Sequence, residues 1–179
     1  MKKYITLLLI SISILSKAQD KMLTKNGIVT FEASVPSFEE IKAKSNIASC
    51  IVNTNTGEIA ALVLVKSFRF KIALMEEHFN ENYIESDKYP KATFKGKIEG
   101  FNYSKITTEA KDFKINGKLE LHGKSKDITI IAKIKRGKDG LEILSNFSVN
   151  SDDFDIKIPS VVSKKVSKKV NIELDFILK

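Results

Sequence analysis

The sequence predicts an all-β fold, an eight-stranded antiparallel β-barrel with one short helix, preceded by a cleavable N-terminal signal peptide. Three observations support this prediction. Apolar and polar residues alternate along about eight segments of the chain, as in strands that are buried on one face only. Turn-forming residues separate these segments at the spacing of hairpins. Hydrophobic residues make up 42% of the 179 residues, which is enough for one core and too little for two.

The first 18 residues have the three parts of a secretory signal peptide. Two lysines follow Met1, residues 4–15 are mostly apolar, and small side chains at Ser16 and Ala18 indicate cleavage after Ala18. The apolar run is too short to span a bilayer comfortably, and a buried N-terminal strand or helix is the alternative interpretation. We therefore expect residues 19–179 to form one barrel domain that is periplasmic or secreted.

Composition excludes several classes of protein. The 30 Lys and Arg outnumber the 22 Asp and Glu, and removal of the three lysines of the predicted signal peptide leaves 27 against 22, or +5. Cys50 is the single cysteine, so an intramolecular disulfide is excluded, and the 8 Gly and 3 Pro argue against disorder. The sequence contains no RNA- or DNA-binding signature.

The first half of the predicted barrel contains four strands. Residues 27–35 and 92–100 alternate clearly between apolar and polar positions. Residues 49–53 and 58–66 flank the turn-forming segment 53–57, so they are expected to form a hairpin.

The second half alternates more regularly. Residues 112–122 form a long strand in which Gly117 predicts a bulge or a bend, and a turn at 123–126 follows it. A further turn is expected at 138–140. The remaining three strands are expected at 128–134, 141–149 and 170–178.

One segment has the period of a helix. In residues 71–83, Ile72, Met75, Phe79 and Tyr83 recur at helical spacing, so this helix is expected to pack on the barrel as a lid or plug. A short turn is expected near 159–164.

The residues available for catalysis are few. His78 and His122 are the only histidines, and a catalytic role would require an orienting carboxylate such as Asp87, Asp127 or Asp152. Because no nucleophile motif accompanies them, a structural role is the favoured interpretation of both, and packing is the favoured role of Cys50. We expect no catalytic residue, no metal site and no cofactor, since two distant histidines do not make a metal site.

Four lysines form the densest basic cluster, at 164–165 and 168–169. One interpretation is contact with anionic lipid headgroups. The other, which we favour, is a solvated segment whose lysines protect the edge of the last strand.

Three stretches of the chain together resemble the YceI family of polyisoprenoid-binding, lipocalin-like bacterial proteins. They are His78–Phe94 with its Lys-Tyr-Pro-Lys-Ala-Thr-Phe, Gly117–Lys126 with its His-Gly pair, and Asp153–Pro159 with its Asp-Phe-Asp-Ile. The resemblance implies an extended antiparallel barrel around a long apolar tunnel that binds an isoprenoid-type lipid, with no catalytic activity. It also implies that the matched histidines brace turns at the rim of the barrel.

We therefore predict an extracytoplasmic protein that binds and carries a long-chain isoprenoid or similar amphiphilic lipid. A ligand-free interaction or stress-response module and, third, a lipid-modifying enzyme are the alternatives. The expected partners are the lipid, transiently a membrane surface, and a second copy of the chain in a homodimer, but not nucleic acid. Strand parity predicts the following ligand-binding residues: Phe31, Phe94, Ile98, Phe113, Ile115, Leu119, Leu121, Ile130, Phe147 and Phe176.

Overall fold

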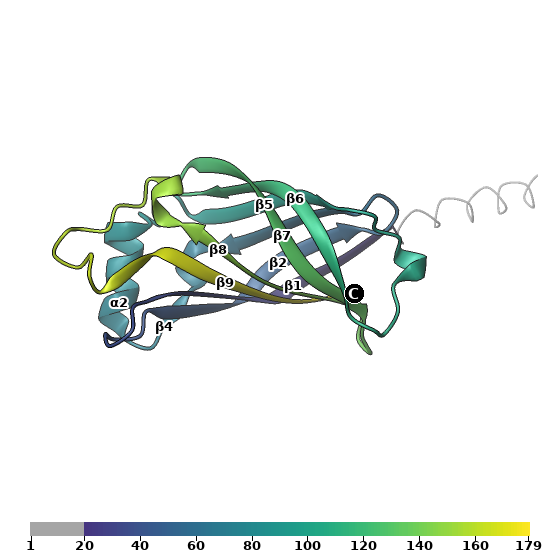
Figure 1. The fold of residues 1–179 in the computed structure, drawn as a ribbon, viewed down its shortest axis with the longest axis horizontal. Coiled ribbons are helices and arrows are strands. Elements are labelled where there is room, and N and C mark those ends of the chain that lie inside the picture. Colours follow the sequence, from purple (N-terminus) through teal and green to yellow (C-terminus); the bar gives the residue numbers. More distant parts are fainter. Residues whose placement is uncertain (1–19) are drawn as a thin grey trace, which may run out of the picture.

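The structure, a computed structural model, describes residues 20–179. The predicted signal peptide, residues 1–18, lies outside these described residues. Nine strands form one antiparallel sheet in the order β1-β9-β8-β7-β6-β5-β3-β2-β4, and β1 also pairs with β2. This last pairing closes eight of the strands into a barrel, as predicted, with the two-residue β4 beside β2 (Figure 1).

The strands of the barrel are long. Their bounds are β1 Lys21–Ser34, β2 Lys42–Asn53, β3 Glu58–Leu64, β4 Arg69–Phe70, β5 Lys91–Ile98, β6 Lys111–Leu121, β7 Lys124–Arg136, β8 Leu141–Asn150 and β9 Val166–Leu178. The strands β1 and β2 begin six to seven residues before the predicted starts. Residues 21–26 lack a clear period, but their backbone pairs with β2 through Thr24↔Cys50, with register shifts on either side of Gly27.

The predicted helix forms, in two parts. The α-helix α2 spans Ala73–His78 and continues as a single π-helical segment, η3, over Phe79–Tyr83. Short 3-10 segments occur at η2 (Val65–Ser67), η4 (Tyr103–Lys105) and η5 (Ser151–Phe154). The predicted turn near 159–164 is present, with the Val162 amide donating to the Pro159 carbonyl at 3.0 Å.

The turn between β6 and β7 is tighter than predicted. Only His122 and Gly123 lie between the strands, and both have positive φ, 51° and 72°. This is the conformation of a two-residue type I′ turn, whose twist matches that of the strands it joins.

Of the bulge or bend predicted at Gly117, the bulge is absent. The registers Gly96↔Gly117 and Gly117↔Ile128 continue without a shift on both sides of β6. The glycine instead leaves room for an aromatic ring, because a Cβ at Gly117 would lie 2.4 Å from the Phe94 ring.

The two ends of the elongated barrel differ (Figure 1). We call the end with α2, the loop 35–41 and the segment 155–165 the helix end. We call the end with the hairpin turns 54–57 and 137–140 the hairpin end. The segment 99–110, which includes η4, covers the hairpin end, where the Arg136 amide donates to the Thr107 carbonyl at 2.7 Å.

Candidate functional site

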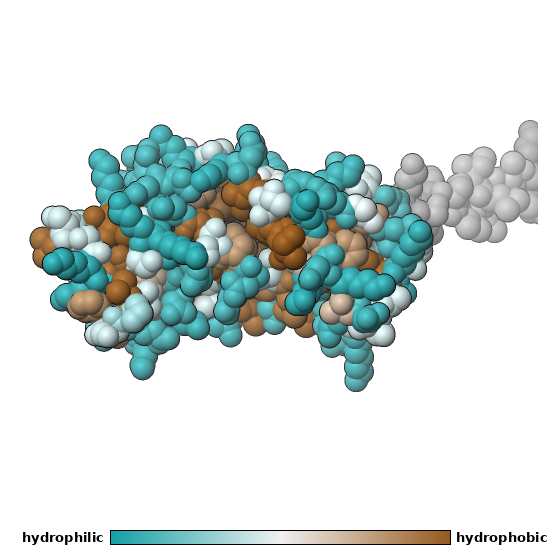
Figure 2. All heavy atoms as spheres, viewed as in Figure 1, coloured by the Kyte–Doolittle hydropathy of each residue, from teal (hydrophilic) through white to brown (hydrophobic). Residues whose placement is uncertain are grey.

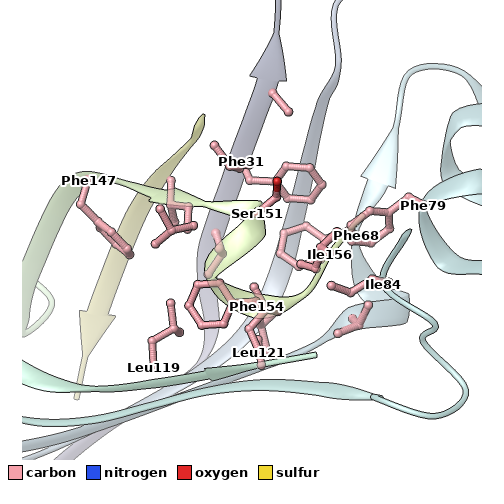
Figure 3. A pocket seen from close by; sticks show the side chains of 18 of the residues that line it. Phe31, Phe68, Phe79, Ile84, Leu119, Leu121, Phe147, Ser151, Phe154 and Ile156 are labelled. Atoms are coloured by element: carbon pink, nitrogen blue, oxygen red, sulfur yellow. The ribbon is translucent and has the colours of Figure 1, made fainter. Parts of the chain in front are cut away.

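A cavity of about 410 Å³ opens inside the helix half of the barrel (Figure 3). Inward side chains of the barrel strands line it, together with residues of η3 and η5. Nearly all of these side chains are apolar, because the inward positions of the strands carry aliphatic and aromatic residues. Water is poorly held in such a space, so the cavity favours an apolar guest.

The floor of the cavity is the packed middle of the barrel. Phe176 lies there with Ala48 and Ile143, all three buried. The Phe176 ring lies against Gly27, where a Cβ would approach it to 2.4 Å. A glycine at position 27 therefore leaves the space that the Phe176 ring occupies.

The cavity exists where two strands separate. The ladder between β7 and β8 runs from Arg136↔Leu141 to Ala132↔Ser145 and stops there, halfway along both strands. Beyond this point η5 contacts both strands, and its Phe154 is fully buried and lines the cavity. The side chains around this part of the barrel leave the cavity unfilled.

Four phenylalanines form the wall beneath the helix. Phe31 of β1 lies with its ring centroid 5.0 Å from Phe68, 5.7 Å from Phe70 and 5.1 Å from Phe79. Edge and tilted contacts of this kind stabilise aromatic clusters by more than their buried area alone. The helical segment is thereby fixed to the barrel by Phe79, and Glu76 adds polar contacts to β4, with Arg69 at 2.9 Å and with the Phe70 amide at 3.1 Å.

The mouth of the cavity lies at the helix end. Phe38, Glu39, His78 and Lys165 line the cavity and are exposed to solvent as well. They come from the loop 35–41, from α2 and from the segment that precedes β9. The ionisable side chains Glu39, His78 and Lys165 are thus gathered at the entrance.

Strand parity placed most of the predicted lining correctly. Eight of the ten predicted residues line the cavity: Phe31, Phe94, Ile115, Leu119, Leu121, Ile130, Phe147 and Phe176. Ile98 and Phe113 do not line it, although both pack in the core. Parity gives the face of the strand but not the distance along the barrel, and these two lie toward the filled hairpin end. The role of the eight in ligand binding stays a prediction.

Several lining residues were not predicted because they come from irregular segments. Phe79, Ser151, Phe154 and Ile156 all contribute to the wall, and none lies on a strand. Period-two alternation gives no signal for such residues. Phe154 did belong to the Asp-Phe-Asp-Ile stretch that carried the family resemblance.

His122 braces the rim of the barrel. Its Nδ1 lies 2.9 Å from the Phe154 carbonyl oxygen and its Nε2 lies 2.9 Å from Oε2 of Glu85. Both partners are acceptors, so the ring donates to both only when each nitrogen carries a proton. The Tyr89 ring packs edge-on against the imidazole, with centroids 4.5 Å apart. This one side chain therefore ties the turn 122–123 to η5 and to the segment after the helix.

The carboxylates considered as catalytic partners of histidine have other partners. Asp87 pairs with Lys66, Asp127 pairs with Lys118, and Asp152 pairs with Lys168. The carboxylate that contacts His122 is Glu85, which no sequence pattern indicated. His78 is exposed at the mouth.

Cys50 packs in the core, 2% exposed. Burial raises the pKa of its thiol to about 12, with a backbone hydrogen bond opposing the shift in part. The thiol is therefore uncharged at neutral pH, as a packing residue should be.

The basic cluster lies beside the mouth. Lys164, Lys165 and Lys169 are exposed, while Lys168 pairs with Asp152 at 2.8 Å. Val161, just before them, is 88% exposed, and the adjacent Val162 lines the cavity. Figure 2 shows hydrophobic residues at the helix end, close to hydrophilic ones.

Within residues 20–179, no three His, Cys, Asp or Glu side chains gather closely enough to hold a metal ion. In the same range, no helix has the length and apolar character needed to cross a bilayer.

Comparisons with known proteins agree with this architecture. A family model described as the YceI-like domain matches residues 20–178. No curated protein matches the sequence significantly.

Solved structures share the fold at low sequence identity. A polyisoprenoid-binding domain from Saccharophagus degradans, implicated in plant cell wall breakdown, superposes with a TM-score of 0.78 at 14% identity, covering 89% of this chain and 98% of that one. BcnA from Burkholderia cenocepacia gives 0.70 at 15% identity, covering 86% and 96%. A YceI protein from Campylobacter jejuni gives 0.60 at 20% identity, covering 81% and 89%.

Proposed function

Because the chain belongs to the YceI-like domain family, we propose that it binds a long-chain isoprenoid or similar amphiphilic lipid in its barrel cavity. The observation that carries this proposal is the apolar cavity of about 410 Å³, which lies within the range of about 300–1,000 Å³ typical of ligand sites. The polyisoprenoid-binding domain from S. degradans, which has the same fold, supports the choice of ligand class.

The energetics favour a long apolar chain. Each methylene group transferred from water into such a cavity gains about 0.8 kcal/mol, so a guest needs few polar contacts. The half-exposed aromatic side chains Phe31 and Phe147 face the empty space and gain contacts when it is filled.

We propose that the protein acts outside the cytoplasm as a carrier of this lipid. The signal-peptide pattern of residues 1–18 supports export. We propose that the protein binds the lipid without modifying it. In support of this, both ring nitrogens of His122 are already in contact with protein groups, the Phe154 carbonyl and Glu85.

The carrier role includes contact with an anionic membrane at the helix end. Val161 offers an apolar tip, Lys164 and Lys165 offer positive charge, and Val162 beside them already lines the cavity. Each lysine near an anionic surface contributes about 1 kcal/mol at low salt. The variant K164E/K165E is expected to bind phosphatidylglycerol vesicles at least tenfold more weakly, whereas K95E/K97E on the barrel side should bind almost normally. Equal losses of vesicle affinity in both variants would contradict an orientation in which the mouth of the cavity faces the membrane.

The binding proposal is tested by identifying the lipid that copurifies with the protein. Protein purified from its native host is extracted with organic solvent, and the extract is analysed by mass spectrometry. We expect one class of isoprenoid lipid near one molecule per chain. Ala61 lines the cavity while Ala60, its neighbour on β3, does not, so Ala61→Phe should lose the lipid and Ala60→Phe should keep it. An empty wild-type protein whose melting temperature is unchanged by added polyprenol would favour a ligand-free module instead.

A further inference from the structure

One hydroxyl inside the apolar cavity has no partner. Ser151, the first residue of η5, lines the cavity and is 5% exposed. Among residues 20–179, no atom lies within hydrogen-bonding reach of its Oγ. Figure 3 shows this oxygen among the carbon side chains of the wall, including Phe31, Phe154 and Ile156.

The other polar side chains of the lining are satisfied or lie at the mouth. The Ser145 hydroxyl donates to the Ile131 carbonyl at 2.7 Å, and the Ser167 hydroxyl donates to the Lys169 carbonyl at 2.8 Å. Thr93 bonds to Glu120. Exposed Glu39, His78 and Lys165 and half-buried Tyr83 belong to the helix end and its loops. Ser151 thus differs from the other lining residues in being deep, polar and unpaired.

The backbone around Ser151 leaves its side chain no structural task. Its carbonyl accepts from the Ile156 amide at 3.1 Å, and the turn that starts there is capped by the Asn150 side chain, which accepts from the Asp152 amide at 3.0 Å. An alanine would keep both bonds. Since a buried hydroxyl without a partner is unfavourable and uncommon, its partner must come from what occupies the cavity, a water molecule when the cavity is empty and the ligand when it is filled.

We propose that the Ser151 hydroxyl hydrogen-bonds a neutral oxygen of the bound lipid, so that the ligand is an isoprenoid alcohol or carbonyl compound and not a bare hydrocarbon. This inference rests on the proposed function. A charged phosphate is disfavoured at this point, because the nearest ionic groups of the segment, Asp152 and Asp153, are acidic and already paired with Lys168 and Lys126.

A matched pair of probes tests the inference. Phytol and phytane share one C20 isoprenoid skeleton and differ by the hydroxyl group and one carbon–carbon double bond, which the same comparison in wild type and variant cancels. Their affinities for wild type and for Ser151→Ala are measured by displacement of the apolar fluorophore N-phenyl-1-naphthylamine. We expect Ser151→Ala to weaken phytol about threefold to tenfold, the value of one neutral hydrogen bond, and to leave phytane unchanged. Phytane binding also reports that the variant is folded.

The control is Ser145→Ala, which removes a hydroxyl that lines the same cavity but is already bonded to Ile131. It should not change the ratio of phytol to phytane affinity. If Ser151→Ala changes neither probe, or weakens both equally, the hydroxyl does not recognise the ligand and the inference is overturned while lipid binding stands. If neither probe displaces the fluorophore from wild type, the proposed function fails and the inference fails with it.

Discussion

The two ends of the barrel are built from the same alternating strands, yet the hairpin end is filled and the helix end encloses a cavity. At the hairpin end Val52, Ile98, Leu141 and Leu178 are almost completely buried against one another. At the helix end Phe31, Phe147, Ile156 and Ile158 also point inward but remain half-exposed. Alternation in the sequence therefore predicts which side chains point into the barrel. Whether those side chains fill the interior depends on the distance between the strands around it.

The strand ladders account for the difference. At the hairpin end β7 and β8 pair through five residues each, next to their turn, and then separate. The pairing of β2 with β3 likewise covers Ser49–Val52, close to the turn 54–57, before the short β4 takes over at Ala43. Both interruptions lie on the side of the helix end, where the cavity is, whereas the ladder between β6 and β7 continues along the whole of β6.

The largest expected effect is on packing. Leu141→Ala at the filled end should lower the free energy of unfolding by about 3 kcal/mol, because it leaves a hole in a close-packed core. Leu121→Ala at the cavity should cost only about 1 kcal/mol, since that side chain already borders empty space. Urea denaturation of lipid-free protein measures both. Equal losses would show that the helix end is packed as tightly as the hairpin end.

A smaller effect is expected from removal of the rim brace. His122→Ala leaves the Phe154 carbonyl and Glu85 without their partner, which should cost about 1–2 kcal/mol. The loss should be local, so amide exchange should accelerate in η5 but not around Leu178. His78→Ala, the exposed histidine at the mouth, serves as the control and should change stability by under about 0.5 kcal/mol. Uniform acceleration throughout the barrel would contradict a local brace.

The smallest effect concerns a surface pair beside that brace. The hydrogen bond and positive charge of Lys124, at 2.8 Å, lower the pKa of Asp155, and Asp155 in turn raises the pKa of Lys124. A carboxyl whose folded pKa is lowered stabilises the protein above its ordinary pKa of 3.8 and loses that contribution as the pH falls through the folded value. Lys124→Met should return the pKa of Asp155 toward 3.8, as followed by carboxyl-carbon NMR. An unchanged pKa would show that the pair does not form in solution.

Regular segments of this barrel were predictable, and irregular ones were not. The strand at 112–122 was placed within one residue of β6, because every second side chain there is apolar. The sequence has no pattern that gives the position of a residue along the barrel. Ile98 and Phe113 were therefore assigned to the cavity, although they do not line it. Ser151 and Phe154 were missed as lining residues because a 3-10 turn of four residues is too short to show a period.

Close packing against glycine also escaped prediction. Gly117 indicated a bulge because glycine in a strand usually marks one, whereas here the neighbouring Phe94 ring occupies its place. The partner of such a glycine lies on another strand. Only the tertiary structure identifies it.

β1 pairs with β9, with Val29 opposite Leu174, and this pairing affects how the barrel folds. β1 and β9 are the first and the last strand of the described residues, so the barrel closes only when the two edges of the sheet pair. Contacts so distant in sequence are slow to form. We therefore expect closure of the barrel, and with it the formation of the cavity, to be a late step of folding.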